Sequence, residues 1–316
     1  PHAAEIGVYN RLKAIESEIQ VIDPRRENDD IDDVISKRIL DFEPDLIIVP
    51  GCAVGYKFLY HVRHQKQSQL IVNWNSEEIR CGERAGQVKQ FGPLFSYIFH
   101  FDQTAIWLFE KLGFHNVSCL MQAFDPVRHT HIPVAREPYI QFIGSLYGDK
   151  YFNRIHLIDY LKKNGIPVRV ANNHCDPQEN SLLYSKAAAS LNLGLNTGEF
   201  PTDSFKGYAI QQRVFEAMGS NTPTLTHYPI GWLPWDDRSY KVFNKHNIVF
   251  YEKEDLLALC REIIQPEVYN RLAQETEHFK HYHTYEHRLI DMINILISKG
   301  LLDDKFKRSW ACCTEL

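Results

Sequence analysis

The sequence predicts an α/β protein with two doubly wound domains, each a parallel sheet covered by helices. Three observations lead to this prediction. The chain has 316 residues, enough for two domains at roughly 150 residues each. Short apolar runs alternate with helical patterns in both halves, as in parallel sheets with crossover helices. Residues 124–138 carry three prolines among polar residues, which indicates a linker between the halves.

In the first half, residues 4–19 show a helical pattern, and strands are predicted at residues 19–23, 45–50, 70–74, 96–101 and 117–121. Helices are predicted near residues 31–42, between residues 50 and 70, and near residues 103–112. A domain of this kind normally opens with a strand. Either the first strand lies upstream of residue 1 or the sheet lacks it, and we favour the first alternative because Pro1 follows no initiator methionine.

The same alternation restarts after the linker. Strands are predicted at residues 139–144, 166–171, 190–195, 223–226 and 248–250. Helices are predicted at residues 151–164, 210–220, 253–264, 266–280 and 284–298. We therefore expect an N-terminal domain at residues 1–130, a C-terminal domain at residues 131–298 and a tail at residues 299–316, with the two domains facing each other across a cleft.

The composition excludes several classes of protein. Hydrophobic residues make up 44% and charged residues 24% of the chain, as in ordinary globular proteins. Asp and Glu exceed Lys and Arg by 40 to 35, which argues against a general nucleic-acid binder. No apolar run approaches the ~20 residues that span a bilayer, and no signal peptide is recognised. The seven scattered cysteines indicate reduced thiols. We expect a cytoplasmic protein with no transmembrane segment.

The most informative stretch is residues 196–223, a polar loop that leads from a predicted strand into the helix at 210–220. In an open α/β sheet, free N–H groups and the helix dipole favour a phosphate at this position. Lys206 and Arg213 can add positive charge, and Glu216 can accept two hydrogen bonds from a ribose. The residues alone support an alternative interpretation equally well. In it, Glu216 only complements the helix dipole and Arg213 is a solvated surface charge.

The end of this helix is also predicted. Asn221 suits the left-handed position that follows a helix, and Pro223 prevents its continuation.

Three blocks of sequence resemble a known family. Residues 212–218 (QRVFEAM) with Thr222 and Pro223 resemble the donor-site helix of GT-B glycosyltransferases, and most of all the CgeB-like (spore-maturation-protein-like) branch of the family 4-like group. Residues 139–147 (YIQFIGSLY), followed by Arg154, resemble the opening of that family's C-terminal domain. Residues 247–257 and 283–289 resemble its closing segment. The N-terminal half resembles the family only in its order of strands and helices.

The resemblance implies a GT-B fold and a glycosyltransferase that uses a nucleotide-diphosphate sugar, with UDP as the expected nucleotide. The C-terminal domain would bind this donor, and the N-terminal domain would bind an acceptor that the sequence does not name: a protein, a glycan, a lipid or a small molecule. Glu216 matches the ribose-binding glutamate, Gly144 and Ser145 match the glycine-bearing loop near the diphosphate, and Arg154 is the expected phosphate partner. The remaining donor contacts are expected at the start of the helix, at Gly207, Tyr208, Ala209 and Ile210.

The expected chemistry needs no metal or cofactor. The negative charge left on the diphosphate can be stabilised by the helix N-terminus together with Lys206, Arg213 and Arg154. The resemblance implies retention of configuration. However, the broader retaining families carry a sugar-contacting glutamate eight residues before the ribose glutamate, where this chain has Tyr208. An inverting reaction would need a base, for which the candidates are His100, Glu77 and Glu78, just after predicted strands.

Two clusters contain residue types that bind metals. The acidic run at residues 29–33 is better explained as the start of a helix. His281, His283 and His287 lack the ligand number and spacing of a standard zinc site, and Thr284 between them suits a helix cap.

Two alternatives to a glycosyltransferase stay open, because a fold does not fix a function. One is a non-catalytic protein that binds nucleotide sugars or carbohydrates. The other is a GT-B-shaped epimerase or phosphorylase.

Overall fold

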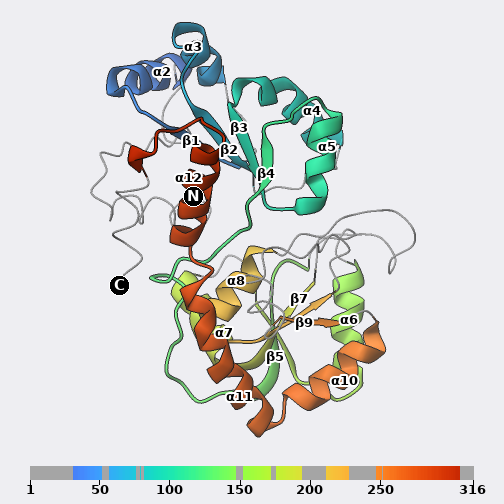
Figure 1. The fold of residues 1–316 in the computed structure, drawn as a ribbon. Coiled ribbons are helices and arrows are strands. Elements are labelled where there is room, and N and C mark those ends of the chain that lie inside the picture. The colour runs from blue at the N-terminus through green and yellow to red at the C-terminus, as the bar shows by residue number, and fades with distance from the viewer. Residues whose placement is uncertain are drawn as a thin grey trace. The chain divides into compact units, whose positions relative to one another are not determined.

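The computed structural model describes residues 31–51, 57–75, 79, 82–146, 152–171, 176–193, 211–227, 247–250 and 252–306. They form two compact units (Figure 1). Unit 1 contains the described residues up to Met121 and those from Arg288 onward, and unit 2 runs from Gln122 to His287. The predicted helix at residues 4–19 and the predicted strand at residues 19–23 lie outside the described residues.

Unit 1 holds a parallel sheet with the strand order β1-β2-β3-β4. The strands are β1 (Ile47–Pro50), β2 (Ile71–Asn75), β3 (Tyr97–His100) and β4 (Val117–Cys119). The helices are α2 (Ile31–Phe42), α3 (Lys57–Gln65), α4 (Gly82–Phe91) and α5 (Ile106–Lys111). Strands β2 and β3 are buried along their whole length, as the continuous apolar runs predict for strands covered on both faces.

Unit 2 holds a five-stranded parallel sheet with the order β6-β5-β7-β8-β9. The strands are β5 (Glu137–Ile143), β6 (Val168–Ala171), β7 (Ala187–Asn192), β8 (Thr224–His227) and β9 (Asn247–Phe250). The helices are α6 (Phe152–Lys163), α7 (Pro177–Lys186), α8 (Gln212–Gly219), α10 (Lys253–Ile263), α11 (Pro266–Thr276) and α12 (Tyr285–Ser298), of which the last continues past the boundary of the unit.

Helices cover both faces of the unit 2 sheet. Successive strand residues point to opposite faces, and β5 shows the consequence. Phe142 belongs to the core that is shared with α6, α10 and α11. Its neighbour Ile143 packs instead with Tyr184 of α7 and Ala217 of α8. The predicted α/β class with parallel, doubly wound sheets is therefore confirmed.

The region between the predicted strands at 166–171 and 190–195 differs from the prediction. Helix α7 is absent from the predicted elements, because it buries polar residues such as Asn180, Ser181 and Ser185 and so lacks an apolar stripe. Asp176 caps the helix by accepting a hydrogen bond from the Gln178 backbone N–H at 2.8 Å. Strand β7 begins at Ala187 rather than at residue 190, since alanines carry no strand signal in sequence.

The proline-marked segment has no regular secondary structure up to the start of β5, but it packs firmly in unit 2. Phe124 is fully buried and forms a parallel bridge with Thr284. The Phe124 N–H donates to the His283 carbonyl and the Tyr285 N–H donates to the Phe124 carbonyl, both at 3.2 Å. The first and last parts of unit 2 are thus paired with each other. We call residues 122–136 the connecting segment.

Helix α8 lies against this segment so closely that a side chain is excluded at Gly219. A Cβ atom there would lie 2.5 to 2.8 Å from three ring atoms of Phe124, and that ring is stacked on Phe279 at 6.0 Å. We expect Gly219→Ala to lower the free energy of unfolding by about 2 kcal/mol, because overpacking a filled core displaces buried groups. Gly86→Ala is the control, since nothing lies within 4 Å of its Cβ position. Equal denaturation midpoints for the two variants would contradict the expectation.

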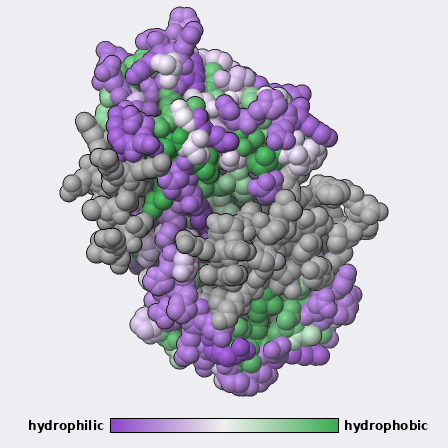
Figure 2. All heavy atoms as spheres, in the orientation of Figure 1, coloured by the Kyte–Doolittle hydropathy of each residue, from purple (hydrophilic) through white to green (hydrophobic). Residues whose placement is uncertain are grey.

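Hydrophilic residues cover much of the described surface on the face drawn in Figure 2. Among the described helices, none combines the length and apolar character needed to cross a membrane. Cys119 and Cys260 are free thiols, and burial raises the pKa of each to about 12. At neutral pH both therefore stay protonated and unreactive.

Candidate functional site

The strand order of unit 2 identifies one edge of the sheet as the place for a ligand. The first strand of the unit, β5, lies between β6 and β7. The connection that follows β5 leads to β6 on one side, whereas the connection that follows β7 leads to β8 on the other side. In open α/β sheets, ligands bind at the carboxyl ends of the strands at such a switch point. Gly144 and Ser145 directly follow β5, and so this topology places both at the switch point.

Gly144 lies beneath the side chain of Arg213. The Arg213 Nη1 atom donates a hydrogen bond to the Ile143 carbonyl at 3.1 Å. A Cβ atom on Gly144 would lie 2.7 Å from that nitrogen and 3.1 Å from the Phe142 Cζ atom. A side chain at this position would therefore displace the Arg213 guanidinium from the backbone. Gly144 does not have a left-handed conformation.

Arg154 of α6 reaches the same turn from another element. Only 4% of Arg154 is exposed, its Nη1 atom donates to the Ser145 carbonyl at 3.1 Å, and its guanidinium lies 5.9 Å from the centre of the Phe142 ring. Two guanidinium groups from helices far apart in the sequence thus hold the carbonyls of Ile143 and Ser145, one on each side of Gly144. The structure brings together Gly144, Ser145, Arg154 and Arg213, which the sequence singled out. Such a turn with two fixed positive charges suits an anion.

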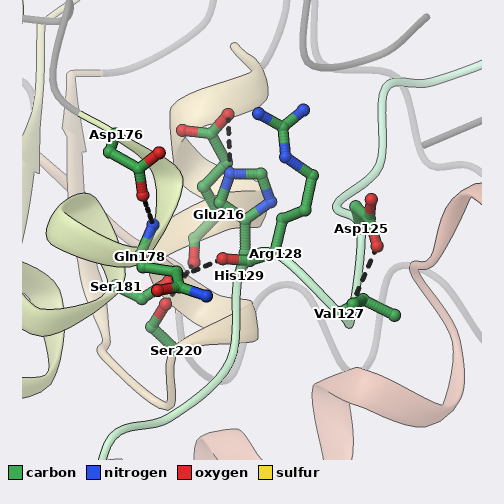
Figure 3. A network of polar contacts seen from close by, with 9 residues as sticks. All are labelled: Asp125, Val127, Arg128, His129, Asp176, Gln178, Ser181, Glu216 and Ser220. Atoms are coloured by element: carbon green, nitrogen blue, oxygen red, sulfur yellow. Dashed lines mark hydrogen bonds and ion pairs between the residues drawn. The ribbon is translucent and has the colours of Figure 1, made fainter. Parts of the chain in front are cut away.

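Glu216 lies one turn after Arg213 on α8 and faces His129 of the connecting segment (Figure 3). The Glu216 Oε1 and His129 Nε2 atoms are 3.6 Å apart, and the side chains are 13% and 1% exposed. The Glu216 side chain is therefore largely shielded from solvent. Its carboxyl group retains limited access to solvent.

Tyr184 of α7 completes the surroundings of Glu216. It is fully buried, and its hydroxyl has no hydrogen-bond partner in the part of the chain that is described. Burial raises the pKa of Tyr184 far above the usual value, the negative charge of Glu216 raises it further, and the positive charge of Arg213 opposes this. Tyr184 is therefore a neutral phenol within electrostatic range of both.

One other residue that the sequence singled out, His100, lies in the described part of unit 1. His100 is fully buried at the end of β3. Its Nδ1 atom accepts a hydrogen bond from the Asp102 N–H at 3.1 Å, and its ring packs against Phe101 and Phe109. The role of His100 as a base stays a prediction.

The remaining candidates lie outside the described residues. They are the diphosphate contacts Lys206, Gly207, Tyr208, Ala209 and Ile210 and the alternative bases Glu77 and Glu78.

His287, near the start of α12, contacts the residue that caps this helix. The Thr284 Oγ1 atom is 2.7 Å from the His287 ring nitrogen Nδ1 and accepts a hydrogen bond from the His287 N–H at 3.5 Å, which confirms the predicted cap. Among the described residues, no group of three or more His, Cys, Asp or Glu side chains could hold a metal ion.

Sequence reasoning missed His129 and Tyr184. His129 lies in a segment interpreted only as a linker, and Tyr184 lies on the helix that was not predicted. One signal was present for His129, since Asp125 and Pro126 are typical of a tight turn that would fix the residues after it.

Fold and site define a two-unit α/β protein in which two arginines hold the turn after the first strand of the second sheet, and a partly buried carboxylate lies one helical turn beyond one of them. Residues 129–294 match the family model described as glycosyl transferase-like. This match covers more than half of the chain, so the protein belongs to that glycosyl transferase-like family. A comparison of the sequence with curated proteins found no significant match.

Solved structures share the fold at low sequence identity. A glycosyltransferase from Rickettsia africae ESF-5 is 11% identical with a TM-score of 0.57, over 95% of this chain and 94% of that one. TarM is 11% identical with a TM-score of 0.55 over 84% of this chain. The match spans only 58% of TarM. The S. aureus MnaA–UDP structure is 13% identical with a TM-score of 0.51, over 96% of this chain and 95% of that one. These likenesses confirm the predicted GT-B fold.

Proposed function

We propose that this protein transfers a sugar from a nucleotide-diphosphate sugar, with UDP as the nucleotide, to an acceptor, without a metal and with retention of configuration. We also propose that it belongs to the CgeB-like branch of the family 4-like group. The observation that carries the proposal is the convergence of Arg213 and Arg154 on the turn at Gly144 and Ser145. Membership of the glycosyl transferase-like family supports the chemistry.

In this proposal the two arginines hold the diphosphate. A guanidinium is planar, always charged at neutral pH and matched to phosphate oxygens. When the sugar–phosphate bond breaks, the oxygen that leaves gains negative charge, and fixed positive groups stabilise it more than they stabilise the bound donor. Lys206 and the N–H groups of residues 207–210 would add to this stabilisation. The positive charges of these side chains would then stabilise the leaving diphosphate, as a metal ion does in other transferases.

Glu216 is proposed to bind the ribose. Its carboxylate can accept hydrogen bonds from two neighbouring hydroxyls. Its position one helical turn from Arg213 fits a nucleotide whose diphosphate lies at the helix N-terminus. The choice of UDP is supported by the S. aureus MnaA structure, which contains UDP.

Thermal unfolding with a panel of UDP, GDP, ADP and dTDP tests the donor site. A nucleotide at a hundred times its Kd adds about 2.7 kcal/mol of stability, so we expect one member, UDP, to raise the Tm of the wild type clearly. Glu216→Ala should lose most of this rise. Glu254→Ala serves as the control, because Glu254 is an exposed glutamate of α10 in the same unit. If no nucleotide stabilises the folded wild-type protein, the donor site is wrong.

Turnover separates the proposed enzyme from its alternatives. A transferase consumes the UDP-sugar and releases UDP as an acceptor becomes glycosylated. An epimerase would interconvert the donor without an acceptor, and a phosphorylase would require inorganic phosphate. Donor binding with none of these reactions would indicate a non-catalytic binding protein.

A further inference from the structure

We propose that His129 is a positioning residue for Glu216. It would fix the carboxylate in the orientation that receives the ribose hydroxyls, and so set donor affinity without touching the donor. The inference rests on the proposed function. It assigns a role in binding to the connecting segment, which the sequence marks only as a linker.

The first step is the contact itself. His129 Nε2 lies 3.6 Å from Glu216 Oε1, and the histidine side chain is 1% exposed. Among the described residues, Glu216 makes no other ion pair and accepts no side-chain hydrogen bond. One carboxylate oxygen therefore faces the imidazole, while the other remains for a ligand. In a site shielded from water, a polar contact between an imidazole N–H and a carboxylate is stronger than it would be on the surface.

The second step is that the histidine is itself held in place. Asp125 organises a turn in which its Oδ1 atom accepts from the Val127 N–H at 2.9 Å and its carbonyl accepts from the His129 N–H at 2.8 Å. The Ser181 hydroxyl of α7 donates to the Arg128 carbonyl at 3.1 Å. Figure 3 shows the Asp125–Val127 and Ser181–Arg128 contacts. The ring therefore presents a fixed nitrogen to Glu216.

The third step concerns the other ring nitrogen. His129 Nδ1 is buried and has no hydrogen-bond partner in the described part of the chain. A neutral imidazole has one N–H donor, and only the tautomer with the proton on Nε2 directs that donor at Glu216. Burying a polar atom without a partner costs stability. A residue chosen for packing alone would avoid that cost, so the contact to Glu216 is the feature that explains a histidine here.

The test measures how much each variant gains from the ribose hydroxyls. Binding of UDP and of 2′,3′-dideoxyuridine diphosphate is measured by calorimetry for wild type, Glu216→Ala and three His129 variants. If the panel selects another base, the corresponding pair is used. His129→Gln can place an amide N–H near the position of Nε2, whereas the shorter side chain of His129→Asn cannot. His129→Ala removes the donor altogether.

We expect the wild type to bind UDP at least about tenfold more tightly than the dideoxy analogue, because a hydrogen bond to a charged group is strong. Glu216→Ala should bind both alike. His129→Ala and His129→Asn should keep less than about a third of the wild-type ratio, and His129→Gln should keep most of it. A merely structural role would lower the Tm of the His129 variants and leave the ratio unchanged.

The outcomes separate the two proposals. If wild type and Glu216→Ala show the same ratio, the ribose role of Glu216 fails, and the proposed donor site fails with it. If Glu216→Ala loses the ratio but His129→Ala and His129→Asn keep the wild-type value, the donor site stands and the positioning role of His129 is overturned. Should His129→Ala not fold, the comparison of His129→Gln with His129→Asn decides the question.

Discussion

Arg213→Ala is expected to weaken the binding of UDP by about tenfold to a hundredfold, which corresponds to the loss of one or two charge-assisted hydrogen bonds. The side chain of Arg213 extends from α8 to the turn after β5, where its Nη1 atom lies 3.1 Å from the Ile143 carbonyl. In the proposed function this guanidinium binds the diphosphate. The measurement is calorimetric titration with UDP, and with the UDP-sugar once the sugar is known.

Arg271→Ala is the matched control for this variant. Arg271 is an exposed arginine of α11 in the same unit, paired with Glu275 at 3.8 Å. The Arg271→Ala substitution removes the same charge from unit 2 without changing the turn. It should leave the UDP affinity within about twofold of the wild-type value, since exposed ion pairs contribute little. Equal losses for the two variants would mean that only the net charge of the unit matters, and the assignment of Arg213 to the diphosphate would fail.

Arg136→Met is expected to lower the free energy of unfolding by about 3 kcal/mol. Arg136 Nη1 donates to the Ala187 carbonyl at 2.7 Å, and Nη2 donates to the Asn221 carbonyl at 2.6 Å. A third contact joins Nη1 to the Thr222 hydroxyl at 3.2 Å. Burial lowers the pKa of Arg136 to about 10, so the group is still charged at neutral pH. Methionine fills much of the volume but leaves these acceptors unpaired, at a cost of about 1–3 kcal/mol each.

Chemical denaturation of Arg136→Met and of Arg169→Met provides the comparison. Arg169 is 54% exposed and pairs with Glu137 at 2.6 Å on the surface, so we expect its loss to cost no more than about 1 kcal/mol. The Arg136 contacts join the start of β7 to the end of α8, and the variant should therefore lose stability in unit 2 as a whole. A cost for Arg136→Met no larger than that for Arg169→Met would refute this account.

The sequence predicts the parallel sheets well, because buried strands are short apolar runs and each run is separated from the next by a helical pattern. It also predicts the end of α8 in detail. Asn221 has a φ of 57°, the left-handed conformation that asparagine tolerates better than most residues. Helix α7 escapes prediction for the opposite reason, since its buried face carries asparagine and serine and gives no apolar period.

The residues of the candidate site also fall into two groups, those that the sequence singles out and those that it does not. Gly144, Ser145, Arg154 and Arg213 could be singled out, because a strand end and a resemblance to a family point to them. The contacts between these residues depend on the order of the strands in the unit 2 sheet. The hydrophobic periodicity of the sequence does not predict that order. The approach of His129 to Glu216 could not be predicted at all. It joins an irregular segment to a helix far along the chain, and no local pattern records such a pair.

The bridge between Phe124 and Thr284 has a consequence for how the chain is organised. Unit 2 is one continuous stretch inserted between two parts of unit 1. The first and last segments of unit 2 are hydrogen-bonded to each other. Once unit 2 has folded, its ends are already joined, so unit 1 has to close only a short loop. The entropic cost of closing a loop rises with its length. Topologically, the inserted unit behaves toward the remainder of the chain like a tight turn.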